Sequence, residues 1–76
     1  MPNAPKIKIG TFRHSKTGKL YEVIGVALQT ETGEPLVVYK PLYESHHELF
    51  ARPYEMFIDM VEINGVATPR FERIDD

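Results

Sequence analysis

Turn signals recur along this sequence at short intervals, and they limit the chain to short, locally paired segments. Asn64-Gly65 is the strongest two-residue hairpin signal. Thr17-Gly18 and Thr32-Gly33 form two further turns, whose glycines supply the positive φ that a short loop needs. No stretch between these turns shows the sustained i, i+3, i+4 spacing of an amphipathic helix. The sequence therefore predicts strands joined by tight turns.

The stretches between the turns are rich in β-branched and aromatic residues, which favour strands. We expect five to six short strands, drawn from residues 7–13, 20–28, 35–42, 49–51, 58–63, 66–68 and 71–74. Gly10 and Gly25 interrupt two of these segments, which indicates a bulge or a kink in each strand. Pro53 suits the first position of a helical turn over residues 53–57, where a missing N–H costs nothing.

This pattern predicts an all-β fold, a small antiparallel SH3-like barrel or roll with one helical turn near residues 53–57. A barrel is favoured because closure removes the exposed edges of a short sheet. We expect one domain over residues 7–74, preceded by a flexible N-terminal arm at residues 1–6 that contains two prolines. A chain of 76 residues is too short for a two-domain enzyme with a cleft between lobes.

Charge and cysteine content narrow the function further. Nine basic and eleven acidic residues give a net charge of −2. Modules that bind nucleic acid are usually basic, because neutralised phosphates supply much of their affinity. The chain has no cysteine, so it has no disulfide, thiolate nucleophile or cysteine zinc site, and we expect a cytoplasmic location. No apolar run approaches the roughly 20 residues that span a membrane, and the N-terminus lacks the apolar core of a signal peptide.

A set of short motifs, in order along the chain, carries a family resemblance. The residues concerned are Gly10-Thr11-Phe12-Arg13-His14, Lys16, Gly18, Tyr21-Glu22-Val23-Ile24-Gly25, Ala27, Glu31-Thr32, Val37-Val38-Tyr39, Leu42-Tyr43, Arg52-Pro53, Met56-Phe57 and Pro69-Arg70-Phe71. Over about residues 8–74 the chain resembles the short bacterial domain of unknown function 1653. The resemblance implies an SH3-type β-barrel, and it brings no reaction, ligand or partner.

The chain departs from the family pattern at two places. Ser15 stands where an aromatic residue often follows the Arg-His pair, and Leu49-Phe50-Ala51 stands where a tryptophan commonly precedes Arg-Pro. The second change keeps an aromatic side chain nearby, which favours preserved packing. The first change argues against a binding surface that uses an aromatic side chain at position 15.

Five residues are candidates for a binding surface: Arg13, His14, Tyr43, Arg52 and Arg70. An arginine offers a planar fork of donors for a carboxylate or phosphate, and a histidine offers a group that titrates near neutral pH. Each also has a structural interpretation. Arg13 could pair with an acid such as Glu22 on the neighbouring strand, His14 could fix the turn, and Arg52 or Arg70 could cap carbonyls.

The eight aromatic residues have two interpretations as well. In small barrels, exposed aromatic rings can form a groove for a peptide, a methylated lysine or a nucleobase. In a chain this short, most rings must fill the core. We expect Tyr43 and Tyr54 to be more exposed than Tyr21 and Tyr39, which lie in the middle of strands.

Catalytic and metal chemistry have little support in the sequence. His46 and His47 are adjacent, and adjacent side chains on an extended chain point in opposite directions, so we expect a solvated loop and no metal. Ser15 and Ser45 have histidines nearby, but no motif places either serine as a nucleophile. We expect no cofactor.

Three functional hypotheses follow. The first is a non-enzymatic interaction module that meets a peptide, an anion or nucleic acid at the barrel rim. The second is a small-molecule-binding protein or minor enzyme that uses His14 with Arg13 or Arg52. The third is a structural subunit that dimerises through an open strand edge. We expect a monomer or weak homodimer that makes no membrane contact.

Overall fold

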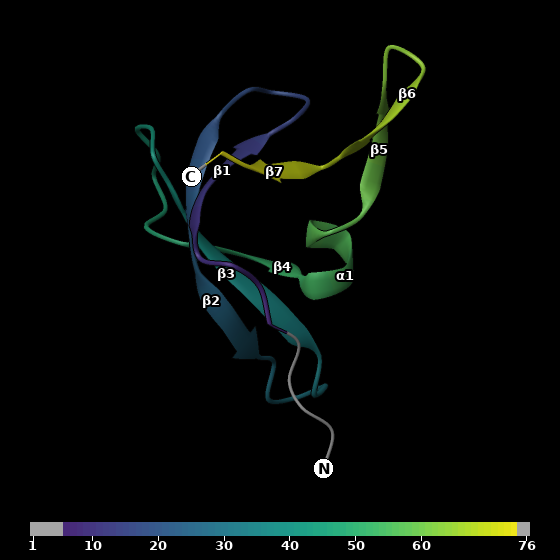
Figure 1. Ribbon diagram of the computed structural model, residues 1–76. Coiled ribbons are helices and arrows are strands. Elements are labelled where there is room, and N and C mark those ends of the chain that lie inside the picture. Colours follow the sequence, from purple (N-terminus) through teal and green to yellow (C-terminus); the bar gives the residue numbers. More distant parts are fainter. Residues whose placement is uncertain (1–5, 75–76) are drawn as a thin grey trace.

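The computed structural model describes residues 6–74 (Figure 1). The elements in chain order are β1 (Gly10–His14), β2 (Leu20–Leu28), β3 (Pro35–Pro41), β4 (Phe50–Pro53), α1 (Tyr54–Phe57), β5 (Met60–Ile63), β6 (Val66–Pro69) and β7 (Phe71–Arg73). The predicted N-terminal arm falls, apart from Lys6, outside the described residues. No helix within residues 6–74 is long and apolar enough to cross a membrane.

Every strand pairing is antiparallel. Five strands form one sheet in the order β4-β3-β2-β1-β7, and β5 and β6 form a separate two-stranded sheet. The prediction of an all-β antiparallel fold with one helical turn is therefore confirmed. No pairing within the described residues joins β4 to β7, so closure into an SH3-like barrel stays a prediction.

The local signals explain where the strands turn and bend. Asn64 and Gly65 have φ values of 53° and 80°, the left-handed pair that a tight two-residue hairpin needs. The pairing of β2 with β3 shifts register between Val23 and Gly25, which is the irregularity that a glycine within a strand indicates. Both features were predictable because glycine and asparagine tolerate backbone angles that other residues avoid.

The core lies on the face of the five-stranded sheet that α1 covers, and it is mostly aromatic. Its buried residues are Phe12, Tyr21, Val23, Val37, Tyr39, Phe57 and Phe71. Phe57 of α1 stacks on Phe71 of β7, with 4.1 Å between ring centroids. Tyr43 and Tyr54 are half-buried beside this core, so their predicted greater exposure relative to Tyr21 and Tyr39 is confirmed.

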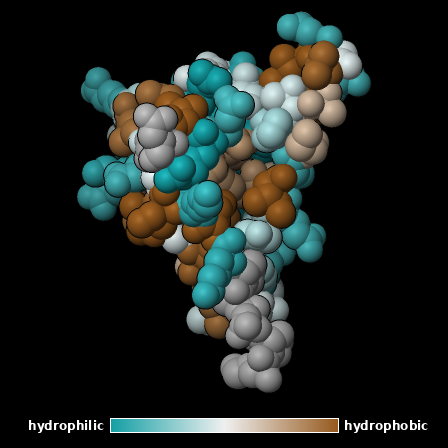
Figure 2. All heavy atoms as spheres, in the orientation of Figure 1, coloured by the Kyte–Doolittle hydropathy of each residue, from teal (hydrophilic) through white to brown (hydrophobic). Residues whose placement is uncertain are grey.

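The β5–β6 hairpin projects from the rest of the chain. Figure 1 shows it standing away from the five-stranded sheet, and Figure 2 shows hydrophobic side chains gathered on it at the upper right. Met60 and Val66 are 56% and 62% exposed. A two-stranded sheet without further packing is marginally stable, so this hairpin is the least supported element of the described fold.

Four details differ from the sequence prediction, and the first is that the described residues form seven strands where five to six were expected. The first strand begins at Gly10 rather than at Ile7, and the fourth covers Phe50–Pro53 rather than residues 49–51. Pro53 does not begin the helix: its ψ of 137° keeps it extended, and the helix starts at Tyr54.

Candidate functional site

Phe71 is the centre of a group of cationic side chains. Its ring is buried against Phe57 and packs against Tyr39 at 5.5 Å between centroids. The His14 ring meets it edge-on at 4.9 Å, and the Arg52 guanidinium carbon lies 5.5 Å from its centroid. We call His14, Arg52 and Arg70 the cationic cluster.

Arg52 reaches Phe71 because of strand alternation. Phe50 and Arg52 are two residues apart on β4, so both point to the face of the sheet that bears the core. Phe50 packs against the Tyr39 ring, and Arg52 donates from Nε to the Tyr39 hydroxyl at 3.3 Å. No carboxylate within residues 6–74 pairs with Arg52, so its two terminal amino groups keep their donor capacity.

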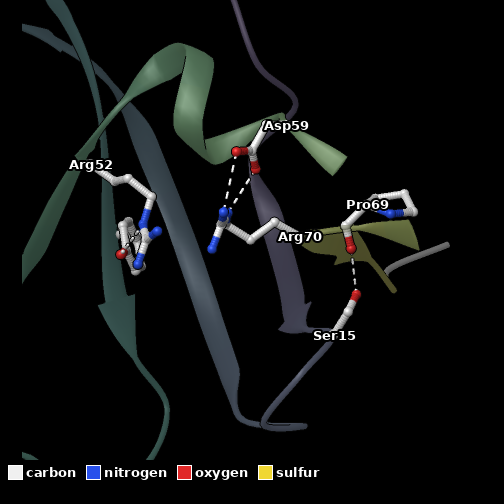
Figure 3. A network of polar contacts seen from close by, with 6 residues as sticks. Ser15, Arg52, Asp59, Pro69 and Arg70 are labelled. Carbon is white, nitrogen blue, oxygen red and sulfur yellow. Dashed lines mark hydrogen bonds and ion pairs between the residues drawn. The ribbon is translucent and has the colours of Figure 1, made fainter. Parts of the chain in front are cut away.

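Arg70 is positioned by a carboxylate. It lies between β6 and β7 and donates from Nε to Asp59 Oδ1 at 2.7 Å and from Nη2 to Asp59 Oδ2 at 3.2 Å (Figure 3). The Arg70 backbone N–H also donates to the Asp59 carbonyl at 3.0 Å. The hydrogen bonds from Arg70 lower the pKa of Asp59 and raise the pKa of Arg70. Such a two-point contact fixes the orientation of the guanidinium plane.

Ser15 attaches the β1–β2 turn to this region. Its hydroxyl donates to the Pro69 carbonyl at 2.5 Å, and its backbone N–H donates to the Arg70 carbonyl at 2.9 Å (Figure 3). Ser15 therefore holds His14, the preceding residue, beside Arg70. A serine is small enough to make both contacts with the same stretch of backbone.

The surroundings of His14 lower its pKa. Burial is the largest cause, and the positive charges of Arg52, Arg70 and Lys16 lower the pKa further. The Thr17 backbone N–H donates to His14 Nδ1 at 3.4 Å, so the neutral ring carries its proton on Nε2. His14 Nε2 makes no hydrogen bond within the described residues. A lowered histidine pKa beside two arginines indicates a local excess of positive potential.

Three of the five candidate residues therefore come together, and Arg13 does not join them. The charges of Arg52 and Arg70 both act on His14 and on Asp59, so both guanidinium groups lie near these two residues. Arg13 lies on the opposite face of β1 and pairs with Glu72 of β7 at 2.6 Å. The interpretation that Arg13 pairs with an acid on a neighbouring strand is confirmed, but the acid is Glu72 of β7. The suggested partner Glu22 is wrong, because Glu22 stands opposite Thr11.

Tyr43 lies beside the cationic cluster without touching it. Its hydroxyl is 2.9 Å from the Tyr21 hydroxyl, and the Lys19 ammonium lies 4.7 Å from the centre of its ring. Tyr21 in turn packs against Phe71 at 5.8 Å. Burial and the bond with Tyr43 raise the pKa of Tyr21. Among the described residues, Tyr43 connects to the cluster through Tyr21.

The histidine pair of the β3–β4 loop has no metal-binding arrangement. His46 and His47 are both exposed, and the His47 ring lies 6.1 Å from the Phe50 ring. Within residues 6–74, no three histidine, aspartate or glutamate side chains converge in a way that could hold a metal ion.

Sequence reasoning missed two residues of the site, Asp59 and Ser15. Asp59 follows α1 in an apparently ordinary polar position, and its distance of 11 residues from Arg70 follows no helical or strand period. Ser15 was considered in the sequence as a departure from a motif and as a serine near a histidine, and neither signal indicated its contact with the Pro69 carbonyl. Both contacts depend on how the β5–β6 hairpin returns to β7, which local sequence does not reveal.

Comparison with known proteins identifies the chain's relatives. A family model described as "Protein of unknown function (DUF1653)" matches residues 10–73. The crystal structure of a DUF1653 protein from Bordetella bronchiseptica is similar to this chain, with a TM-score of 0.82 and 30% sequence identity, over 90% of this chain and 87% of that one. No curated protein matches the chain.

Proposed function

This chain belongs to the DUF1653 family of proteins of unknown function, and because the family supplies no activity, we propose from the site itself that the protein is a binding module for a discrete anionic group. The group would be a carboxylate or phosphate-like oxyanion held between His14, Arg52 and Arg70. The binding is non-covalent, and the proposal includes no reaction.

The observation that carries this proposal is that the half-buried guanidinium of Arg52 has no ion-pair partner among the described residues. Its guanidinium is half-buried against Phe71 and fixed at Nε by Tyr39. No carboxylate of the described residues forms an ion pair with it, and Asp59, the carboxylate on which its charge acts, is already bound by Arg70. A partly buried charge without a partner is costly, so such groups are usually paired. An oxyanion from outside the chain would supply the missing charge and accept hydrogen bonds from the free amino groups of Arg52.

The surrounding groups support the same ligand chemistry. Arg70 keeps N–H groups that Asp59 does not use, and His14 has Nε2 free within residues 6–74. Asp59 compensates one of the arginine charges, which leaves a surplus of positive charge in the cluster. Hydrogen bonds between charged donors and an oxyanion are about twice as strong as neutral ones.

A single group fits this site better than an extended polyanion. Nucleic-acid binding needs several phosphate contacts along a basic stripe. Here the three donors converge on one place, Arg13 lies on the opposite face, and the chain carries a net charge of −2. We therefore favour a ligand, small molecule or protein, that presents one anionic group.

The test is an NMR titration with sulfate, an oxyanion whose charge does not change near neutral pH. In low-salt buffer at pH 6.0, we expect saturable shifts of the Arg52 and Arg70 Nε–H signals and of the His14 ring. Arg52→Gln should weaken sulfate binding about tenfold or more, since a hydrogen bond to a charged group contributes roughly 1.5–3 kcal/mol. Lys40→Gln, an exposed site on β3, is the matched control and should leave the affinity unchanged.

Two results would reject the site. One is a sulfate titration whose shifts map away from His14, Arg52 and Arg70. The other is an affinity that falls equally in the Arg52→Gln and Lys40→Gln variants, because that result would reflect general charge and no specific site.

A further inference from the structure

Phe57 and Phe71 also line a second feature, a surface hollow of about 360 Å³. It lies between the segment that precedes β1, the end of α1 and β7. Ile7 and Ile58 form its apolar walls together with the phenylalanine rings. Ile58 is 50% exposed, so part of this apolar wall faces solvent.

Cationic side chains surround the apolar walls. Lys6 and Lys8 come from the segment before β1, and Arg73 comes from β7. No aspartate or glutamate of the described residues lines the hollow. The hollow thus combines apolar walls with a rim of one charge sign.

Two hydrogen bonds hold the start of the chain around Gly10 against β7, and so fix one wall of the hollow. Arg73 donates from Nε to the Ile9 carbonyl at 3.3 Å, and the Ile74 backbone N–H donates to the Thr11 carbonyl at 2.9 Å. These bonds fix the chain on both sides of Gly10 against β7. The hollow therefore has defined walls, as small-molecule sites usually have.

We propose that this hollow binds a small amphipathic carboxylate, a hydrocarbon body that carries one anionic head group. The hydrocarbon would cover Ile7 and Ile58, and the carboxylate would contact the ammonium groups of Lys6 and Lys8. Charge complementarity determines the head group, because the charged side chains of residues 6–74 that line the hollow are all positive.

The size of the hollow favours a small molecule over a folded partner. Its volume lies near the lower end of the roughly 300–1,000 Å³ that is typical of small-molecule pockets. This site is distinct from the cationic cluster: none of His14, Arg52 and Arg70 lines it. Its failure would leave the proposed anion site standing, and the reverse also holds.

The test uses decanoate below its micelle concentration, with the methyl signals of Ile7 and Ile58 as NMR probes of the full chain. Decanol tests the hydrocarbon without the charge, and acetate tests the charge without the hydrocarbon. We expect decanoate to shift both methyl signals saturably, and to bind at least tenfold more tightly than either comparison compound.

Two variants localise the binding, each with a matched control. Ile58→Ser removes a half-exposed apolar wall and should weaken decanoate binding roughly five- to tenfold. Leu28→Ser, at an apolar residue that is 64% exposed at the end of β2, should leave binding unchanged. Lys8→Gln should also weaken decanoate binding, and Lys40→Gln should not.

Three outcomes would overturn the proposal. Decanoate could give no saturable shift at Ile7 or Ile58. Decanol could bind as tightly as decanoate, which would remove any role for the rim charges. The shifts could instead map to Met60 and Val66, which would make the exposed β5–β6 hairpin the apolar binding surface.

Discussion

Single residues determine the electrostatics of the site, and His14 responds most directly to pH. Its folded-state pKa lies below the ordinary value of 6.5, because of burial and the charges of Arg52, Arg70 and Lys16. The unfolded chain therefore binds a proton at His14 more readily than the folded chain. By linkage, the contribution of His14 to stability is complete above pH 6.5 and is lost as the pH falls below it.

The lowered pKa of His14 in the folded chain predicts how stability depends on pH. Between pH 7.5 and pH 5.5, the wild-type chain should lose more free energy of unfolding than a His14→Gln variant does. Urea denaturation of both proteins at the two pH values measures the difference. A wild-type protein that loses no more stability than the variant would show that His14 is not held near the cations.

Arg13 should behave differently from the arginines of the cationic cluster. Arg13 and Glu72 form a surface ion pair, with both side chains 49% exposed, and such pairs contribute about 0–1 kcal/mol. Arg13→Gln should therefore lower the free energy of unfolding by less than about 1 kcal/mol and leave sulfate affinity unchanged. A tenfold loss of sulfate affinity in Arg13→Gln would place this residue in the site after all.

The error over Arg13 shows what sequence reasoning could not reach at this scale. The residue types were informative, since three of the five candidates do come together. Arg13 and His14 are adjacent on β1, so strand alternation puts them on opposite faces, and only the register with β2 and β7 decides which of the two faces the core. The loop between β1 and β2 closes with a Gly18 N–H to His14 carbonyl bond at 2.7 Å, a detail that the turn motif alone does not specify.

At the scale of elements, turn chemistry was the reliable guide. The second strand begins and ends where the sequence predicted, and Asn64-Gly65 forms the β5–β6 turn. The pairing of nonconsecutive strands could not be predicted from local sequence, because β7 pairs with β1 across more than fifty residues. The partners of Asp59 and Ser15 followed from that long-range pairing and were missed with it.

The projecting hairpin gives a prediction about local stability. Within residues 6–74, strands β5 and β6 pair only with each other, and neither contributes a residue to the buried core. Their backbone amides should exchange with solvent much faster than those of β2 and β3, because low packing permits local opening. Hydrogen-exchange NMR measures this directly. Equal protection in both sheets would mean that the hairpin is held by contacts absent from the described fold, such as a partner.

At the scale of the whole molecule, one aromatic core supports both the fold and the two proposed sites. Phe57 is 1% exposed and links α1 to β1, β3 and β7 through ring contacts with Phe12, Tyr39 and Phe71. A chain of this length buries only roughly 60% of the surface that its unfolded state exposes, so it has little reserve stability. The loss of one such ring should therefore affect the entire chain.

Phe57→Ala should cost about 3–5 kcal/mol, the usual effect of deleting a buried phenylalanine ring. A chain of this size has an expected stability on the order of 4–11 kcal/mol, so much of the variant should unfold in low urea. Phe57→Leu, which keeps most of the volume, should cost less. A loss below about 1 kcal/mol in Phe57→Ala would contradict the described core.

The convergence of His14, Arg52 and Arg70 is the claim on which the proposed function depends, and the pKa of His14 tests it most directly. An NMR titration of the His14 ring in the wild-type chain, in Arg52→Gln and in Arg13→Gln compares the two arginines under the same conditions. We predict that Arg52→Gln raises the His14 pKa toward 6.5, and that Arg13→Gln leaves it unchanged. A His14 pKa that stays the same in Arg52→Gln would contradict the cationic cluster.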